Sequence, residues 1–544
     1  MKKSNRFKMC ASLSLITFLL LVSFPTVDQG APSGKLISAY SSDVGNMDAM
    51  ISVGGGNWPV LSIGIWEGLI STNAETFQYE PWLCKSWRLL GDGMVWEFAL
   101  RKGVTFHNGE PFNAQAVKFS FDRMMGKGGY DPKLKPEFKP SYRGIYDRLI
   151  DHIEIVDDYT IRFYMKSKTV EMLDRFGTAI PMVPPGYIKK VGDDEFAKAP
   201  IGTGAFKLAD QKVGESITLE ANENYWNKSP KQGQLRIPYI KTILQRLIPE
   251  DETRISALRV GEIDLAVNIP SHRVKAIEQD TNIALKFQFS NAPIYIGINT
   301  VLEKDPTTGE PNPWRDLRVR KALGYAINRE EIVKNILTGH EALHYMYTPG
   351  QLGYSEALAK KYIPPYDPAK AKKLLADAGY SKGIDAVLNA ASGRLAMTKE
   401  VTDAIAGYLT AVGIRTKINI GEYRLIASKI TTKELYPLDL FIAAPGPEPL
   451  TMLRGLFSSN NVFGLHGGDP NIDKLIDQAF SEFDNTKRAE IYRKIFAYHA
   501  ENDVFFVPLY CATSVTGLRS DRWSWKMSKY ASIPEYHLIR AFSK

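Results

Sequence analysis

The sequence predicts an α/β protein with mixed sheets, divided into more than one domain. Two observations support this prediction. Short segments of alternating or β-branched apolar residues recur along the whole chain, and segments with helical apolar periodicity separate them. At 544 residues, the chain is also longer than one hydrophobic core normally supports. The composition, with 44% apolar and 24% charged residues, is typical of a soluble globular protein.

The strand predictions rest on alternation and on apolar runs. Residues 96–101 and 160–165 alternate, and the second segment follows an Asp157-Asp158 pair that is typical of a hairpin turn. Residues 294–299 and 504–510 are apolar at most positions, so we expect them to be buried on both faces. Such strands are able to cross from one domain to another.

The helix predictions rest on capping signals. Asp367 and Pro368 are a typical start, and Gly379 is a typical stop. Asn113 is expected to cap another helix in the same way. Long apolar-periodic segments at 314–337 and 486–502 predict two further helices.

The N-terminus predicts export. An uncharged segment, 9–27, with an apolar stretch too short to span a bilayer, follows four basic residues, Lys2, Lys3, Arg6 and Lys8. Residues 1–31 are therefore expected to be a cleaved signal peptide, with a cleavage site between Ser23 and Ala31. Cys10 precedes the apolar stretch, which argues against a lipoprotein. The remaining chain has no long basic run, so we expect no nucleic-acid partner.

Several motifs occur in a fixed order over nearly the whole chain after the leader. The longest, at 96–120, combines a strand, a tight turn at Asn108-Gly109 and the helix capped by Asn113. Shorter motifs are 201–207, 222–226, 258–264, 316–323 and 507–510. As a set, these motifs resemble the family 5 extracellular solute-binding proteins, which include the dipeptide, oligopeptide and nickel binders of ABC importers.

The resemblance implies a two-lobed periplasmic-binding-protein fold, similar to class II, with mixed sheets and an extra inserted domain. Lobe I would comprise 32–75, 201–299 and 507–544. The inserted domain would be 76–200, and lobe II would be 300–506. Hinge motion near Asn299 and Val507 would close the lobes around a ligand in the cleft.

The resemblance also implies a function. The protein would be a monomeric periplasmic component of an ABC importer that captures a small molecule or short peptide. It would deliver this ligand to permease subunits in the inner membrane, whose ATPase is a separate chain, since this sequence has no phosphate-binding loop. No enzyme activity, cofactor or metal is expected. A ligand sensor for a membrane receptor remains an alternative, and the ligand remains open.

The candidate ligand-binding residues come from four regions. Val53, Gly54, Gly55, Asn57 and Trp58 lie where peptide-binding relatives line the cleft with backbone, although an ordinary turn would have the same sequence. Tyr295 and Tyr510 lie on the two predicted crossing strands and offer a ring and a hydroxyl group. Buried core tyrosines would look identical. Arg394 lies in a loop that relatives place at the cleft, where it would bind a carboxylate.

The segment 443–449 departs from the family. Peptide-binding relatives have a Trp and an Asp here, and in some of them the Asp pairs with the peptide's α-ammonium group. This chain retains only an acidic residue followed by proline, with Pro447, Glu448 and Pro449 in sequence. Either Glu448 replaces the missing Asp, or the ligand has no free N-terminal ammonium group. A rigid loop distant from the ligand is the third possibility.

Two features raise other possibilities. His340, Glu341 and His344 form an HExxH pattern, which would indicate a secreted zinc hydrolase if it lay within a helix. The pattern begins where a predicted helix ends, directly after Gly339, so chance occurrence is the preferred interpretation. Cys84 and Cys511 are either disulfide-bonded or two buried thiols.

Overall fold

The computed structural model describes residues 32–41, 47–51, 64–126, 143–178, 180–228, 238–392, 395–443, 446–530 and 535–542. Residues 32–544 form one compact unit. The unit is a mixed α/β structure with two larger sheets, as the sequence predicts.

The larger sheet has ten strands in the order β14-β13-β15-β12-β16-β11-β1-β10-β9-β8. Parallel and antiparallel pairs both occur, because β1 is parallel to β10 and β11 whereas β12 is antiparallel to β15 and β16. The strand bounds are β1 Ser33–Tyr40, β8 Phe206–Lys212, β9 Ser216–Ala221, β10 Ile240–Leu247, β11 Leu265–Ala266, β12 Ile283–Ile298, β13 Ile384–Ala391, β14 Ile414–Gly421, β15 Leu438–Ile442 and β16 Phe506–Arg519.

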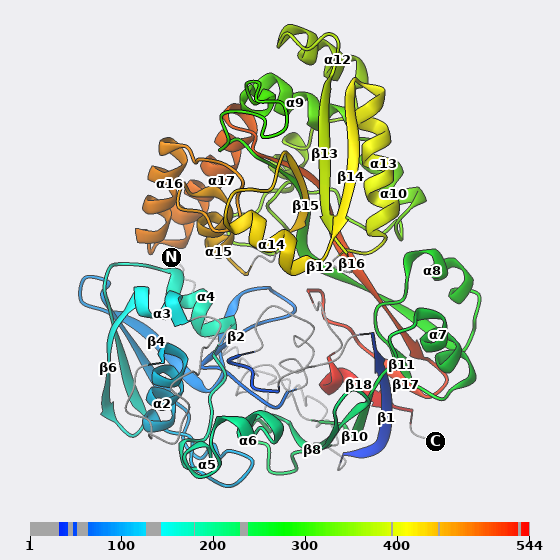
Figure 1. The fold of residues 1–544 in the computed structure, drawn as a ribbon. Coiled ribbons are helices and arrows are strands. Elements are labelled where there is room, and N and C mark those ends of the chain that lie inside the picture. Colours follow the sequence, from blue (N-terminus) through cyan, green and yellow to red (C-terminus); the bar gives the residue numbers. More distant parts are fainter. Residues whose placement is uncertain are drawn as a thin grey trace, which may run out of the picture. The chain divides into compact units, whose positions relative to one another are not determined.

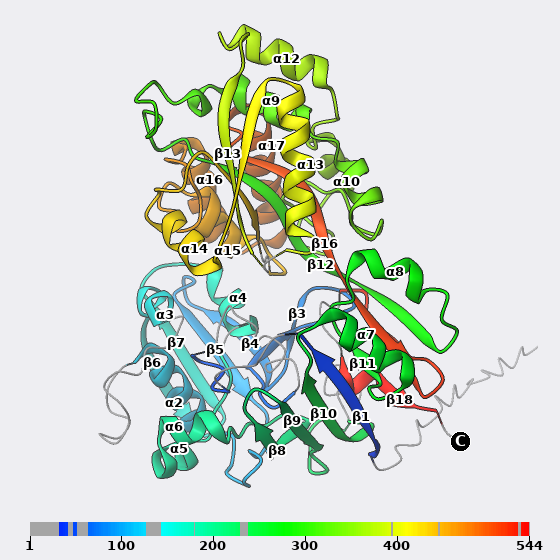
Figure 2. The same cartoon turned by 45° about the vertical axis from the view of Figure 1, so that its right-hand side comes forward.

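β12 and β16 are neighbours near the middle of this sheet. Their antiparallel ladder runs from Ile283 opposite Arg519 to Gly297 opposite Phe506. Figures 1 and 2 both show this pair passing from the part that contains β1 and β10 to the part that contains β13 and β14. The register shifts between Phe289 and Pro293, and again between Ile294 and Tyr295. The predicted crossing strands are therefore present, and both are longer than predicted.

The second sheet has four strands in the order β4-β5-β7-β6, all antiparallel. Its strands and the helices of the same segment are β4 Cys84–Leu90, β5 Val95–Leu100, α2 Ala114–Met125, α3 Arg143–Leu149, β6 Ile150–Asp157, β7 Thr160–Met165, α4 Glu171–Thr178, α5 Pro185–Val191 and α6 Asp193–Lys198. Aromatic and aliphatic side chains between the sheet and α2 form a core of its own, separate from the cores around the large sheet. Two two-stranded sheets pair β2 Ile70–Thr72 with β3 Tyr79–Pro81, and β17 Trp523–Trp525 with β18 Ile539–Ala541.

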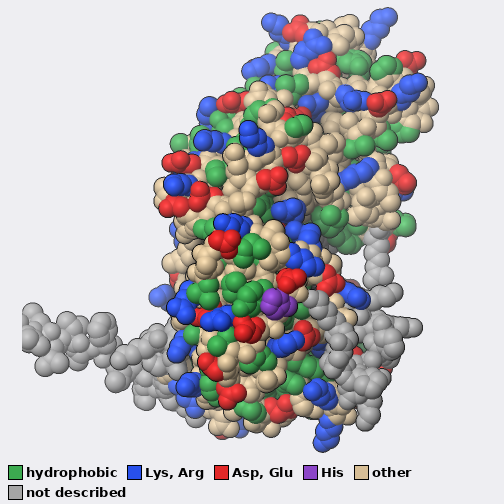
Figure 3. Space-filling model, turned by 90° about the vertical axis from the view of Figure 1, so that its left-hand side faces the viewer, with side chains coloured by type: hydrophobic (Ala, Val, Ile, Leu, Met, Phe, Trp, Pro, Cys, Tyr) green, Lys and Arg blue, Asp and Glu red, His purple; other side chains and the backbone are tan. Residues whose placement is uncertain are grey.

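The remaining helices lie around the large sheet (Figures 1 and 2). They are α7 Asp251–Val260, α8 Ser271–Ile277, η2 Pro313–Arg315, α9 Leu317–Ala326, α10 Arg329–Asn335, α11 Glu356–Lys361, α12 Pro368–Asp377, α13 Thr398–Ala411, α14 Tyr423–Thr431, α15 Leu450–Met452, η3 Leu453–Phe457, α16 Pro470–Ser481, α17 Asn485–Asn502 and η4 Tyr536–Leu538. Within the described ranges, no helix combines the length and the hydropathy that a membrane span requires. On the face shown in Figure 3, basic and acidic side chains are interspersed.

The capping predictions are confirmed, and one helix prediction is wrong. The side chains of Asn113 and Asp367 accept backbone hydrogen bonds at the starts of α2 and α12. The periodic segment 314–337 is not one helix but η2, α9 and α10. The helix breaks at Ile327 because Asn328 adopts a non-helical conformation and caps α10, accepting from the backbone N–H of Glu331.

A buried carboxylate joins distant parts of the chain. Glu67 is 6% exposed and accepts four hydrogen bonds, from Trp82 Nε1, Thr203 Oγ1, Tyr225 OH and Trp226 Nε1, at 2.5–2.8 Å. The pKa of Glu67 is raised by burial, while the four donors act in the opposite direction. Four neutral donors thus offset part of the cost of burying the acid.

Candidate functional site

The structure describes only part of the predicted site. Val53, Gly54, Gly55, Asn57 and Trp58 lie outside the described residues, as does Arg394. Their assignment to a ligand site remains a prediction.

Tyr295 on β12 and Tyr510 on β16 are both buried, with exposures of 1% and 2%. Neither hydroxyl group has a hydrogen-bond partner among the described residues. The pKa of each is raised by burial. The two rings belong to different hydrophobic clusters, so the structure does not bring them together as a pair. A buried tyrosine hydroxyl group normally has a partner, and both residues therefore have unused hydrogen-bonding capacity.

Asp439 on β15 is a residue that the sequence analysis missed. It is opposite Gly297 in the β12–β15 ladder and 3% exposed, and its Oδ1 has no hydrogen-bond partner in the described part of the chain. Burial raises its pKa to about 8, and its charge acts on the hydroxyl group of Tyr295. The signal was a lone acidic residue in the apolar segment 438–442.

Glu341 lies close to Tyr510. Its Oε1 accepts a hydrogen bond from Thr338 Oγ1 at 2.8 Å, while its Oε2 is buried without a partner in the described ranges. The negative charge of Glu341 adds to burial in raising the pKa of the Tyr510 hydroxyl group. Each predicted tyrosine thus has a buried, incompletely bonded carboxyl group as a neighbour.

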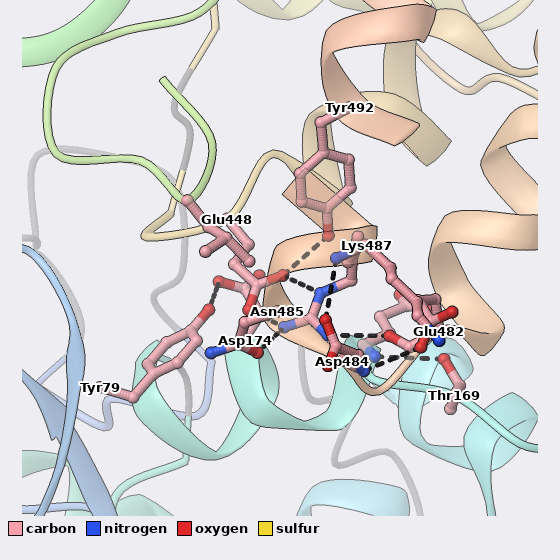
Figure 4. Close-up of polar contacts among 12 residues, drawn as sticks. Tyr79, Thr169, Asp174, Glu448, Glu482, Asp484, Asn485, Lys487 and Tyr492 are labelled. Atoms are coloured by element: carbon pink, nitrogen blue, oxygen red, sulfur yellow. Dashed lines mark hydrogen bonds and ion pairs between the residues drawn. The ribbon is translucent and has the colours of Figure 1, made fainter. Parts of the chain in front are cut away.

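Glu448 is part of a buried ion pair. Arg488 donates to both of its carboxylate oxygens, from Nε at 2.7 Å and from Nη2 at 2.8 Å. Tyr492 donates a third hydrogen bond at 2.7 Å. Figure 4 shows Glu448 and Tyr492 near Asp174 and Tyr79. The neighbouring Pro447 accepts a hydrogen bond from the backbone N–H of Leu352. The charge of Glu448 is therefore neutralised within the protein.

The HExxH pattern does not have the geometry of a zinc site. α10 ends at Asn335, and residues 340–344 are not helical. His344 Nδ1 lies 3.1 Å from the hydroxyl group of Tyr354, and Glu341 accepts a hydrogen bond from Thr338. Across the described residues, no three His, Cys, Asp or Glu side chains are grouped so that they could hold a metal ion. A zinc protease needs both histidines on one helical face.

Cys84 and Cys511 are free, buried thiols. Burial raises the pKa of each to about 12, which makes both poor nucleophiles at neutral pH. Of the two possibilities left by the sequence, the structure has the unlinked one.

Comparison with known proteins identifies relatives over most of the chain. Residues 78–464 match the model of the bacterial extracellular solute-binding proteins, family 5 Middle. The glutathione-binding protein GsiB of Pectobacterium atrosepticum is 30% identical over 62% of this chain, and the match spans 60% of that relative's length. Heme-binding protein A of Haemophilus influenzae is 26% identical over 79% of this chain and 78% of its own length.

Solved structures agree in fold. The periplasmic binding protein DppA of Helicobacter pylori, in complex with the peptide STSA, is 27% identical. It has a TM-score of 0.75 over 93% of this chain and 98% of that chain. NikA of Brucella suis, in complex with Fe(III)-EDTA, has a TM-score of 0.79 at 22% identity, over 94% and 100% of the two chains. The fold is therefore the predicted one, that of the two-lobed periplasmic binding proteins.

Proposed function

Because the chain belongs to the family 5 bacterial extracellular solute-binding proteins, we propose that it captures a small solute between two lobes and delivers it to an ABC importer. The observation that carries this proposal is the family match over 78–464. It is supported by relatives that are named for binding glutathione, heme and di- or tripeptides, and by the peptide-bound DppA structure. All of these are binding proteins, and we propose that this chain has no catalytic activity.

The location and partners follow from the same proposal. Residues 1–31 are a cleaved signal peptide, and the mature protein is a periplasmic monomer without a lipid anchor. It docks on inner-membrane permease subunits, and a separate chain supplies ATP hydrolysis. Homologues that are periplasmic binding proteins support this location. Lobe I comprises 32–75, 201–299 and 507–544, the inserted domain 76–200 and lobe II 300–506.

The proposed ligand site combines the residues predicted from the sequence with Asp439 and Glu341, the two buried carboxyl groups beside the predicted tyrosines. The buried hydroxyl groups of Tyr295 and Tyr510 support it, because each is without a hydrogen-bond partner in the described residues. A polar ligand supplies such partners when the lobes close. Val53, Gly54, Gly55, Asn57, Trp58, Arg394 and Pro447 are retained as proposed ligand contacts.

We further propose that the ligand has no free N-terminal ammonium group that pairs with Glu448. A buried carboxylate that an arginine already holds through two hydrogen bonds has little left to offer a second cation. This favours ligands such as N-blocked peptides, amides or anionic conjugates over free dipeptides. Glu448 then pairs with Arg488 and does not contact the ligand.

The experiment starts from protein purified without denaturation. Native mass spectrometry should show a retained small molecule whose mass disappears after unfolding and refolding. Calorimetric titration of the stripped protein then compares a tripeptide with its N-acetylated form, together with glutathione, heme, opines and a nickel complex. We expect the acetylated peptide to bind at least as tightly as the free one. A preference for the free peptide by about tenfold or more would refute the proposed ligand class, and no binding of any solute would refute the function.

Sensing is the remaining alternative to transport. Uptake of the identified solute by a strain that lacks this gene decides between them. Loss of uptake supports the importer, and unchanged uptake with a lost transcriptional response supports the sensor. The zinc hydrolase has no support from the relatives or from the geometry of residues 340–344.

A further inference from the structure

A contact links the segment that carries the four-stranded sheet to the helices that follow β15. On one side are Val170, just before α4, and Glu171 and Asp174 in α4. On the other side are Thr451 of α15, Arg454 of η3 and Phe480 of α16. We call these six residues the clasp.

The clasp contains a shared carboxylate. Asp174 is 3% exposed, and its two oxygens accept from different sides of the contact. Tyr79, in β3 on the same side, donates to Oδ1 at 3.0 Å, and Thr451 on the other side donates to Oδ2 at 2.5 Å. Figure 4 shows the Tyr79 hydrogen bond. A buried carboxylate needs such donors, so separating Thr451 from Asp174 removes a strong hydrogen bond.

Three further contacts cross the same boundary. The backbone N–H of Val170 donates to the carbonyl oxygen of Phe480 at 2.9 Å. Arg454 Nε lies 3.4 Å from Glu171 Oε2, and Glu171 also pairs with Arg148 and Arg175 on its own side. The side chain of Val170 is 1% exposed and belongs to the hydrophobic cluster that contains Leu453 and Phe480. Apolar packing, a backbone hydrogen bond and an ion pair thus act together with Asp174.

The two sides of the clasp lie before and after β12 in the chain. Residues 76–200 come before β12, whereas Thr451 and Phe480 come after it and before β16. Between Asp174 and Thr451 the chain passes through β12, which pairs with β16 in a ladder that is irregular at 289–295. Any bending at that irregularity moves one side of the clasp relative to the other.

We propose that the clasp holds the two sides together without ligand, so that the stripped protein already populates the closed arrangement. Closure then costs the ligand less of its binding free energy, because affinity scales with the population of the competent state. Gly446 offers a second way to disturb the clasp. A Cβ atom on Gly446 would overlap Oδ1 of Asp174, and the φ of Gly446 lies outside the left-handed region. Gly446→Ala should therefore push against Asp174 by steric overlap and not through backbone strain.

The test measures distances between spin labels at cysteines replacing Lys198 and Lys399, which lie on α6 and α13 and are exposed. Cys84 and Cys511 are buried and remain unlabelled. The protein is first stripped of retained solute by unfolding and refolding. We expect a short-distance population in the wild-type background, reduced about tenfold relative to the long-distance one by Thr451→Val and by Gly446→Ala.

Tyr79→Phe is the matched control. It also removes a hydrogen bond to Asp174, but Tyr79 and Asp174 lie on the same side of the clasp, so this hydrogen bond does not cross the boundary. We expect it to change the ratio less than about twofold. Only long distances in the stripped wild type would overturn the proposal. It would also be overturned if Thr451→Val and Gly446→Ala both left the ratio unchanged, or if Tyr79→Phe equalled Thr451→Val. Melting temperatures of all variants establish that each is folded, and either crossing variant suffices if the other does not fold.

Discussion

Asp439 gives the most direct prediction, because its side chain is buried and its Oδ1 has no hydrogen-bond partner in the described residues. Its pKa rises from the ordinary value of 3.8 to about 8 in the folded protein. Because the raised pKa means that the folded state holds this proton more tightly, the folded protein is most stable below the unfolded pKa of the group. Its free energy of unfolding falls as pH rises from the unfolded pKa through the folded pKa. A difference of about four pH units corresponds to about 6 kcal/mol, an upper limit because water penetration lowers the cost of charge burial.

The perturbation is Asp439→Asn, which has nearly the shape of the neutral acid and cannot ionise. We expect the variant to match the wild type near pH 4 and to be more stable by at least about 2 kcal/mol at pH 9. Urea titrations from pH 4 to pH 9, followed by tryptophan fluorescence, measure the difference. Asp403→Asn, on the exposed face of α13, is the control. A stability difference that does not grow with pH would refute the reasoning.

Three further predictions concern buried polar groups. Arg488→Met should lower stability by about 3–5 kcal/mol, and adding Glu448→Gln should recover most of it, since the loss reflects an unpaired buried charge; urea titrations of both variants test this. Glu67→Gln should cost about 2–3 kcal/mol, because its new amide group faces hydrogen-bond donors, and a melting-temperature change below the error of measurement would contradict it. Cys84 and Cys511 should react with a maleimide only after unfolding, and mass spectrometry of folded protein would reveal any labelling.

Local sequence patterns predicted the elements better than their partners. The caps at Asn113 and Asp367 depend only on residues within a few positions, so the sequence alone was enough to predict them. The break at Asn328 was missed because apolar periodicity continued on both sides of it. The order of strands in the large sheet depends on pairings between β1 and β10, about 200 residues apart, which no local pattern contains.

The candidate site shows the same division. Tyr295 and Tyr510 were chosen for their strands, but their unused hydroxyl groups became evident only when the packing was known. Glu448 was singled out because its segment departs from the family, but the sequence could not reveal its partner Arg488, which lies 40 residues further on, on α17. Asp439 gave a weak signal, because acidic residues are mostly exposed, so burial of this one was not expected from the sequence.

The place of β16 in the sheet bears on when the protein can fold. This strand, Phe506–Arg519, lies between β12 and β11, so without it the sheet is divided into two unconnected halves. A chain still being synthesised lacks this strand until almost the end, and it therefore cannot complete its central sheet early. A truncation after Asp503 should accordingly fail to fold cooperatively, and a sharp melting transition in that fragment would contradict this consequence.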